Sequence, residues 1–230
     1  LMMPDNTGFY IDDVAVPVSW YVVDEGRNDM FYFKVGNQVL QEKVTPGNYS
    51  LVTLNEELVA KMASAGFTNY FVSAPNVSKN IIRIVGTTTT TFEILTDKQV
   101  RDLGYDSSAT VNNILRNFTA KVNHNNSVYE SGFVDLFPIR NLYLSCSGLG
   151  NFNTMSVSGE RSIVKKIPVN AGYGEMIFDQ SVVGIDYLDC SHQTLSRIGF
   201  QLKDVFGRVV DLHGNHFSFS IVFSRISEIQ

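Results

Sequence analysis

The stretch IGFQLKDVFGRVVDLHGNHFSFSIVF, residues 198–223, decides the fold class of this chain. In its last part Phe217, Phe219, Ile221 and Phe223 lie two residues apart, with serines in most of the positions between them. Successive side chains of a β-strand point to opposite faces, so this alternation predicts a strand with one apolar face. The beginning of the stretch alternates in the same way, and Gly, Asn and Asp residues lie between the two parts. Such a pattern favours an antiparallel β-sandwich or barrel.

The rest of the chain after residue 131 has the same character. Aromatic and β-branched residues, which favour strands, recur in short runs between turn-forming residues. The expected strands are Gly132–Leu136, Arg140–Ser145, Ser162–Val169, Glu175–Asp179, Gly184–Leu188, Ile198–Asp204, Val209–Leu212 and Phe217–Phe223. Near the N-terminus, GFYIDDVAVPVSWYVV predicts a strand, a bend at Pro17 and a second strand. We expect residues 1–26 to join the β-sandwich of residues 131–230.

Residues 27–106 are predicted to form a small α+β subdomain with two short helices. Two extended runs flank Gly36-Asn37, a dipeptide that suits a hairpin turn. A helical turn near residues 111–117 and an Asn-rich loop follow, so residues 107–130 are expected to link the subdomain to the sandwich. The fold class is therefore mainly β, with an antiparallel sandwich and a small α+β subdomain.

Both helices carry sequence signals at their ends. The first is expected from about Leu54 to Ala65, because apolar residues three or four apart lie on one helical face. Thr53 and Glu56 fit a capping box, in which each side chain satisfies a backbone donor of the first turn. The second helix is expected to follow Thr96, in the capping-box sequence TDKQ.

Five consecutive threonines, Thr87–Thr91, stand between the runs Ile81–Val85 and Phe92–Leu95. A disordered spacer or a mucin-like stalk would also contain proline and serine, and the run has neither. Threonine is β-branched and favours strands. We therefore expect a β-hairpin whose turn or second strand contains the threonines.

Composition excludes several classes of function. The chain has 230 residues, 44% of them hydrophobic, and a net charge of −5. A nucleic-acid-binding domain usually has a basic face, so direct sequence-specific nucleic-acid binding is not expected. No apolar run approaches the roughly 18 residues of a membrane span. Cys146 and Cys190 are expected to be buried thiols, although four Asn-X-Ser/Thr sequences, at Asn48, Asn76, Asn117 and Asn125, leave a single disulfide open.

The residues with chemical potential form weak patterns. Asp211, His213 and His216 are metal-ligand types in one short segment, but a polar strand–turn–strand connection has the same composition. Cys190, Ser191 and His192 are adjacent, yet nothing in the sequence supplies the base and the orienting group that a nucleophile needs. No phosphate-binding loop or nucleophile elbow is present. We therefore expect no enzymatic activity, no catalytic residues, no cofactor and no bound metal.

A family resemblance is carried by three segments: FVDLFPIRNLYLSCSGLGNFNT, RSIVKKIPVNAGYGEMIFDQ and LSRIGFQLKDVFGRVVDLHGNHFSFSIVF. They resemble jelly-roll capsid proteins, of the penton or minor capsid type, from double-stranded DNA viruses of the Polinton, virophage and adenovirus-like lineage. The closing block of that family is matched by Phe200, Leu202, Asp204, Gly207, Val210, Leu212, Gly214, Phe217 and Phe219. VAVPVSWYVV, TPGNYSLVTLNEELVAKM and TFEILTDKQVRDLGY resemble earlier elements of the same proteins.

The resemblance implies a jelly-roll-type sandwich and a structural role in a virion. Its implied partners are further copies of the chain, as a pentamer or a trimer, and other capsid proteins. Its implied location is the virion, assembled in the host cytoplasm or nucleus.

Two other classes of function stay open. A host-attachment spike or a carbohydrate-binding sandwich would bind a host receptor or glycan through Trp20, the tyrosines and the segment NHNNSVYE. An enzyme or metalloprotein would use Asp211, His213 and His216.

Overall fold

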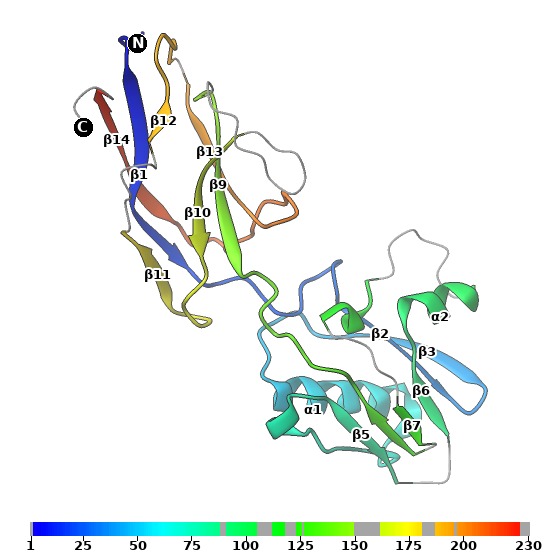
Figure 1. Ribbon diagram of the computed structural model, residues 1–230. Coiled ribbons are helices and arrows are strands. Elements are labelled where there is room, and N and C mark those ends of the chain that lie inside the picture. Colours follow the sequence, from blue (N-terminus) through cyan, green and yellow to red (C-terminus); the bar gives the residue numbers. More distant parts are fainter. Residues whose placement is uncertain are drawn as a thin grey trace. The chain divides into compact units, whose positions relative to one another are not determined.

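The computed structural model describes residues 2–87, 91–104, 112–117, 123–125, 127–149, 162–180, 187–195 and 197–225. The chain forms two compact units, coloured by sequence in Figure 1. The first unit combines Leu1–Trp20 with Ile139–Gln230, and the second is Tyr21–Pro138. The chain therefore enters the first unit, builds the whole second unit, and returns to complete the first.

The first sheet of the first unit is built around β1 (Thr7–Pro17). Along one side of β1 runs β14 (Ser218–Arg225). Along the other side, β12 (Leu188–Asp189) pairs with the beginning of β1 and β11 (Met176–Asp179) pairs with its end. All of these pairs are antiparallel, so the two ends of the sequence lie in one sheet.

The second sheet has β9 (Asn141–Ser147) between β10 (Ile163–Pro168) and β13 (Gly199–Lys203), again antiparallel. Apolar residues from both sheets form a single buried cluster. β1 contributes four inward side chains to it: Phe9, Ile11, Val14 and Val16. The register shifts between Asp12 and Ala15, a bulge that keeps Val14 on the buried face.

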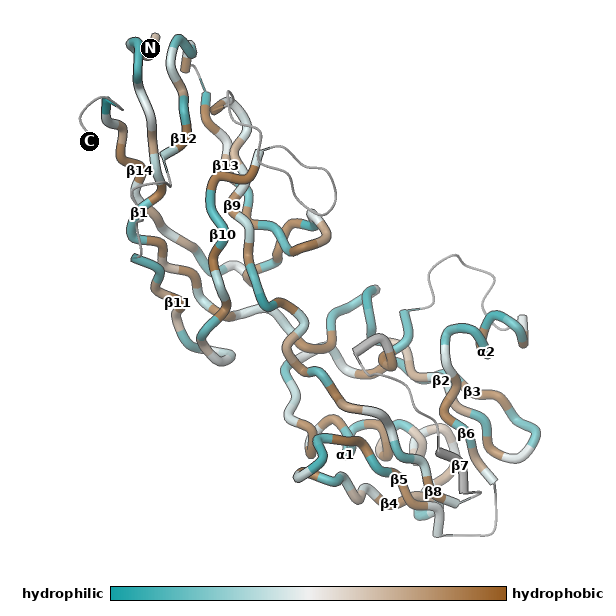
Figure 2. The backbone as a smooth tube through the Cα atoms, viewed as in Figure 1, coloured by the Kyte–Doolittle hydropathy of each residue, from teal (hydrophilic) through white to brown (hydrophobic). Residues whose placement is uncertain are grey.

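β14 confirms the alternation in the sequence. Phe217, Phe219 and Ile221 pack against the sandwich core, whereas Ser218 and Ser220 are exposed. Phe223 contacts the ring of Phe9 at a centroid distance of 6.0 Å. Figure 2 shows the resulting mixture of hydrophobic and hydrophilic residues along the strands of this unit.

Several predicted strands of this part of the chain differ from the structure. Val209–Leu212 does not form a ladder, and Val209 makes an isolated bridge to Lys203 instead. Gly132–Leu136 runs without a strand in the second unit. Most of Gly184–Leu188 lies outside the described residues, and β12 begins at its last residue. β1 ends at Pro17, and the second strand expected behind it does not form. Val18 still donates from its N–H to the Glu175 carbonyl at 2.9 Å, and Val23 makes only an isolated bridge, to Gly47.

The second unit contains two small antiparallel sheets and two α-helices among its described residues. One sheet has the order β3 (Gln38–Lys43), β2 (Met30–Val35) and β6 (Phe92–Ile94), and the predicted hairpin joins its β2 and β3 at Gly36-Asn37. The other has the order β4 (Phe71–Ser73), β5 (Arg83–Gly86), β8 (Val128–Glu130) and β7 (Asn123–Asn125). The helices are α1 (Leu51–Met62) and α2 (Asp97–Asp102), with short helical turns at Ala63–Phe67, Val77–Lys79 and Ile114–Asn117.

Helix α1 begins three residues earlier than predicted. Its capping box is Ser50 with Thr53: the Thr53 N–H donates to Ser50 Oγ at 3.2 Å and the Ser50 N–H donates to Thr53 Oγ1 at 2.9 Å. The predicted pair of Thr53 and Glu56 is therefore wrong, because Thr53 already serves the helix that Ser50 begins. The capping box of α2, formed by Thr96 and Gln99, is confirmed.

The predicted hairpin across the threonines is wrong. β5 pairs with β4 and β8, whereas β6 pairs with β2 in the other sheet. Both sides of β5 are thus occupied by strands that are distant in sequence. Thr87 stays with the sheet of β4 and β5, donating from its N–H to the Tyr70 carbonyl at 2.8 Å. The Thr91 carbonyl, next to β6, accepts from the Gly36 N–H at 2.9 Å. Thr88–Thr90 lie outside the described residues.

The observed unit boundaries fall at Trp20/Tyr21 and Pro138/Ile139, whereas the sequence suggested residues 26/27 and 130/131. Val23 pairs with Gly47 through two backbone hydrogen bonds, which places residues 21–26 in the second unit. Val134 is fully buried in that unit's core, and β8 of the expected linker is a strand of its sheet. Both boundaries differ from the predicted ones because backbone pairing, which composition does not reveal, assigns these residues to the second unit.

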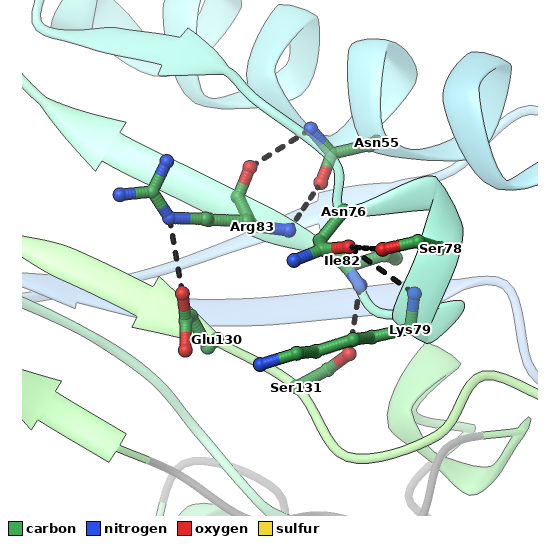
Figure 3. A network of polar contacts seen from close by, with 8 residues as sticks. All are labelled: Asn55, Asn76, Ser78, Lys79, Ile82, Arg83, Glu130 and Ser131. Atoms are coloured by element: carbon green, nitrogen blue, oxygen red, sulfur yellow. Dashed lines mark hydrogen bonds and ion pairs between the residues drawn. The ribbon is translucent and has the colours of Figure 1, made fainter.

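A buried asparagine connects α1 to the second sheet of this unit (Figure 3). Asn55 donates from Nδ2 to the Arg83 carbonyl and accepts from the Arg83 N–H, each at 3.0 Å. Ser131 forms a similar pair with Ile82: its hydroxyl accepts from the Ile82 N–H at 2.9 Å and its own N–H donates to the Ile82 carbonyl. Glu130 holds the Arg83 side chain at 3.0 Å. These side chains supply hydrogen bonds where the strand ladder ends.

Candidate interaction surfaces

The turn after β13 is held by one carboxylate. Asp204 is 6% exposed, and its Oδ1 accepts from the backbone N–H groups of Phe206 (2.8 Å) and Arg208 (3.0 Å). Its Oδ2 binds the Arg208 guanidinium at 2.8 Å to Nε and 2.7 Å to Nη2. Gly207, at φ +79°, allows the sharp reversal, because a positive φ is readily adopted only by glycine. The Asp204 turn, residues 204–209, is therefore a preorganised structure.

This turn displays apolar side chains to solvent. Phe206 is 66% exposed and Val209 is 62% exposed, with Val205 beside them. The Arg208 guanidinium lies 4.9 Å from the centroid of the Phe206 ring, a cation–π arrangement. An exposed aromatic ring next to an arginine, held by a rigid scaffold, has the composition of a binding hot spot.

Removing this carboxylate should loosen the turn. We expect Asp204→Ala to lower the unfolding free energy of the first unit by about 2 kcal/mol, because two backbone donors and a guanidinium lose their acceptor. Trp20, the single tryptophan, is buried in the same core, so its fluorescence during urea unfolding reports this change. Asp211→Ala is the matched control, because Asp211 is exposed and accepts from the His213 N–H in a similar turn. Equal losses in the two variants would contradict the role given to Asp204.

A second apolar surface is the outward face of β11, with Phe178 63% exposed and Met176 42% exposed. Ile177, between them, is buried in the core, so Met176 and Phe178 point to the opposite side of the sheet. On β1 their partners in register are Pro17 and Ala15, and Tyr173 is exposed in the preceding turn. The hydrophobic colour of this strand is visible in Figure 2. We call Tyr173, Met176 and Phe178 the β11 face.

Neither surface is among the candidate sites that the sequence predicts. Asp204 and Gly207 were recognised only as part of a family motif, and Phe206 stood in an expected connection between strands. For β11 the signal was present in the run Met176-Ile177-Phe178. Three consecutive apolar residues on a strand place at least one apolar side chain on each face.

The metal candidates form a structural turn. Asp211 Oδ1 accepts from the His213 N–H at 2.8 Å, His213 Nδ1 lies 2.8 Å from the Ser19 carbonyl oxygen, and Ser19 Oγ donates to the Leu212 carbonyl at 2.8 Å. His216 is exposed. Within the part of the chain that the structure describes, no group of three or more His, Cys, Asp or Glu residues is placed to hold a metal ion. The structure thus does not bring Asp211, His213 and His216 together as a metal site.

Cys190, Ser191 and His192 do not form a catalytic group. Cys190 is fully buried and directs Sγ to the Thr7 carbonyl at 3.5 Å, and burial raises the pKa of its thiol. Ser191 Oγ donates to Asp189 Oδ1 at 2.6 Å, and the exposed His192 lies 3.2 Å from Asp5. Cys146 is buried too, and both cysteines are free thiols, as expected. A buried thiol with a raised pKa makes a poor nucleophile.

Of the residues expected to bind carbohydrate, Tyr70 and Tyr173 are exposed, whereas Trp20 is not. Trp20 is 8% exposed and belongs to the sandwich core, so its ring does not offer a face to a sugar. The segment NHNNSVYE contributes β7 and β8 instead of a long loop, and Asn126 lies outside the described residues. No helix in the described ranges is long and apolar enough to cross a membrane.

Comparison with known proteins identifies the fold. No protein-family model and no curated protein matches the chain. Among solved structures, the crystal structure of the mavirus penton protein matches over 96% of this chain and 86% of its own length, with a TM-score of 0.53 at 11% identity. The chain shares the fold of this penton protein. A chain of the Sputnik virophage structure, determined by cryo-EM, matches over 100% of this chain and 91% of its own, with a TM-score of 0.47 at 10% identity.

The match to the mavirus penton protein confirms the fold class expected from the sequence. The chain is mainly β, with an antiparallel jelly-roll-type sandwich and a small α+β unit that carries two short helices. Because the match spans nearly the whole chain, it includes residues of both units.

Proposed function

We propose that this chain is a structural virion protein of the minor capsid or penton-like type, acting by self-association in an icosahedral shell. The observation that carries the proposal is the fold match over 96% of the chain to the mavirus penton protein. At 11% identity this match concerns the fold, so the function is our inference from it. Function is carried by particular surfaces of a fold.

The surfaces of the first unit support assembly. The Asp204 turn and the β11 face present large apolar side chains on rigid elements, which is typical of protein–protein contacts. The proposed partners are further copies of the chain, as a pentamer or a trimer, and other capsid proteins. The proposed location is the virion, with assembly in the host cytoplasm or nucleus. The net charge of −5 speaks against a nucleic-acid partner.

The alternative of a host-attachment or carbohydrate-binding module has less support. Of the residues on which it depends, Trp20 is buried and NHNNSVYE contributes two strands. Tyr70 and Tyr173 are exposed and have the polar tip that can bind a sugar, so the alternative now depends on the tyrosines.

Size-exclusion chromatography with light scattering, followed by negative-stain microscopy, tests the proposal. We expect a concentration-dependent homo-oligomer whose particles have five-fold or three-fold symmetry. A strictly monomeric protein at high concentration, over a range of ionic strengths, would overturn the proposed function.

A further inference from the structure

The Asp204 turn and the β11 face lie on opposite flanks of the same sandwich. On one flank β13 faces β14, since the rings of Phe200 and Phe219 are 4.8 Å apart. On the other flank Lys165 of β10 donates to the Ile11 carbonyl of β1 at 3.2 Å and lies 3.6 Å from Asp179, the last residue of β11. Figure 1 shows the segment after β13 and the strand β11 on opposite sides of this unit.

We propose that the Asp204 turn of one copy packs on the β11 face of a second copy, in a head-to-tail contact. This inference rests on the proposed function, and it names the two surfaces through which the chain would self-associate. Two unlike patches on opposite flanks cannot meet within one copy. A heterologous contact of this kind leaves one free surface at each end, so repetition gives a closed ring or an open filament.

The two surfaces match in chemical character, because both carry exposed apolar side chains. The turn projects Phe206 and Val209 from a rigid loop, whereas the β11 face is an open strand surface carrying Phe178 and Met176. Large apolar residues that pair across an interface and exclude water from each other are typical of its energetic centre.

Charges beside the two surfaces are opposite in sign. Lys203 and Arg208 flank the turn, and the Arg208 side chain is 49% exposed although it also binds Asp204. Two exposed acidic residues flank the β11 face: Asp13 lies in the partner strand β1, and Glu175 directly precedes β11. A basic rim that meets an acidic rim favours this orientation over a contact between two like surfaces.

The areas are consistent with the apolar centre of a larger interface. Given the size of aromatic side chains and the observed exposures, each surface offers roughly 300 Å² of apolar area. A stable interface buries about 800 Å² per partner, so neither surface suffices alone. Pairing the turn with the face supplies a desolvated centre, around which the charged residues form the rim.

Alanine variants test whether both surfaces are needed. Light scattering over a dilution series should show that Phe206→Ala and Phe178→Ala each raise the dissociation constant of self-association at least about tenfold. Both residues are more than 60% exposed, so circular dichroism and Trp20 fluorescence should match the wild type. Phe133→Ala is the matched control, because Phe133 is 57% exposed in the second unit, and it should assemble as the wild type does.

A disulfide trap tests whether the two surfaces meet. Val209→Cys and Met176→Cys are prepared as separate proteins, and both native thiols are buried and free. Under mild oxidation we expect a disulfide-linked dimer when the two variants are mixed, and little when either is oxidised alone.

The outcomes separate the inference from the proposed function. If the wild-type protein is monomeric, the proposed function itself is refuted. If the wild type assembles but Phe178→Ala assembles equally well, or if the trap links like variants as readily as unlike ones, the head-to-tail contact is wrong while the structural role stands.

Discussion

Replacing Asn55 with alanine is expected to lower the unfolding free energy of the second unit by about 3 kcal/mol. Asn55 is 0% exposed on α1 and makes hydrogen bonds to both the N–H and the carbonyl of Arg83, with Ser73 Oγ as a further partner. Alanine leaves the Arg83 N–H without its acceptor in the interior and leaves a space where the amide was. The Arg83 carbonyl still accepts from the Ala74 N–H, which limits the loss.

The second unit can be observed separately. Both α-helices among the described residues lie in it, so far-ultraviolet circular dichroism during urea unfolding follows this unit. Glu56→Ala, at an exposed position one residue further along α1, should change the unfolding free energy by less than about 0.5 kcal/mol. Asn55→Asp keeps the shape but replaces the Nδ2 donor with a carboxylate oxygen, so we expect it to be at least as destabilising as alanine. A loss for Asn55→Ala no larger than that for Glu56→Ala would refute the bridging role.

Local patterns in the sequence predicted local structure. The alternation over Phe217–Phe223 located β14, and the Thr96 capping box located the beginning of α2. Both depend on residues within a few positions of each other. The first capping box was misplaced because Ser50, Thr53 and Glu56 offer two overlapping versions of the same motif. Only the packing of Leu51 in the core shows which version the chain uses.

Strand pairing is harder to predict from the sequence, because it depends on contacts between residues that are distant along the chain. β5 resembled one half of a hairpin with β6, but its partners are β4 and, more than 40 residues later, β8. No local signal near the threonines distinguishes these arrangements. The observed unit boundaries differ from the predicted ones for the same reason. Val23, for example, belongs to the second unit because of its hydrogen bonds to Gly47.

The candidate surfaces were only partly predictable. The motif residues Asp204 and Gly207 were recognisable, and the structure gives them a physical role in the turn. The exposure of Phe206 was not recognisable, because an apolar residue between strands is as compatible with burial as with display. Asn55 interrupts the apolar face of α1, which marks it as unusual, but its partner Arg83 is 28 positions away.

Replacing Gly148 with alanine is expected to lower the unfolding free energy of the first unit by about 3–4 kcal/mol, combining backbone strain with overpacking. Gly148 follows β9 directly and has a φ of +104°, which a residue with a Cβ adopts only under strain. A Cβ built there would lie 2.7 Å from the Arg197 carbonyl oxygen. Because that oxygen belongs to the backbone, relief requires the segment before β13 to move. Ser147 pairs with Gly199, so such a movement would disturb the register of the second sheet.

Gly174→Ala separates strain from the clash. Gly174 belongs to the same unit and has a φ of +82°, but a Cβ there would meet nothing within 4 Å. Backbone strain alone should therefore lower the unfolding free energy of the Gly174→Ala variant, by about 1–2 kcal/mol. Urea unfolding followed by Trp20 fluorescence measures both variants in one core. The difference between their unfolding free energies isolates the contact with the Arg197 carbonyl. An equal loss of unfolding free energy in the two variants would contradict the role of this contact. It would mean that the segment before β13 moves at no cost and that glycine is needed at position 148 only for its positive φ.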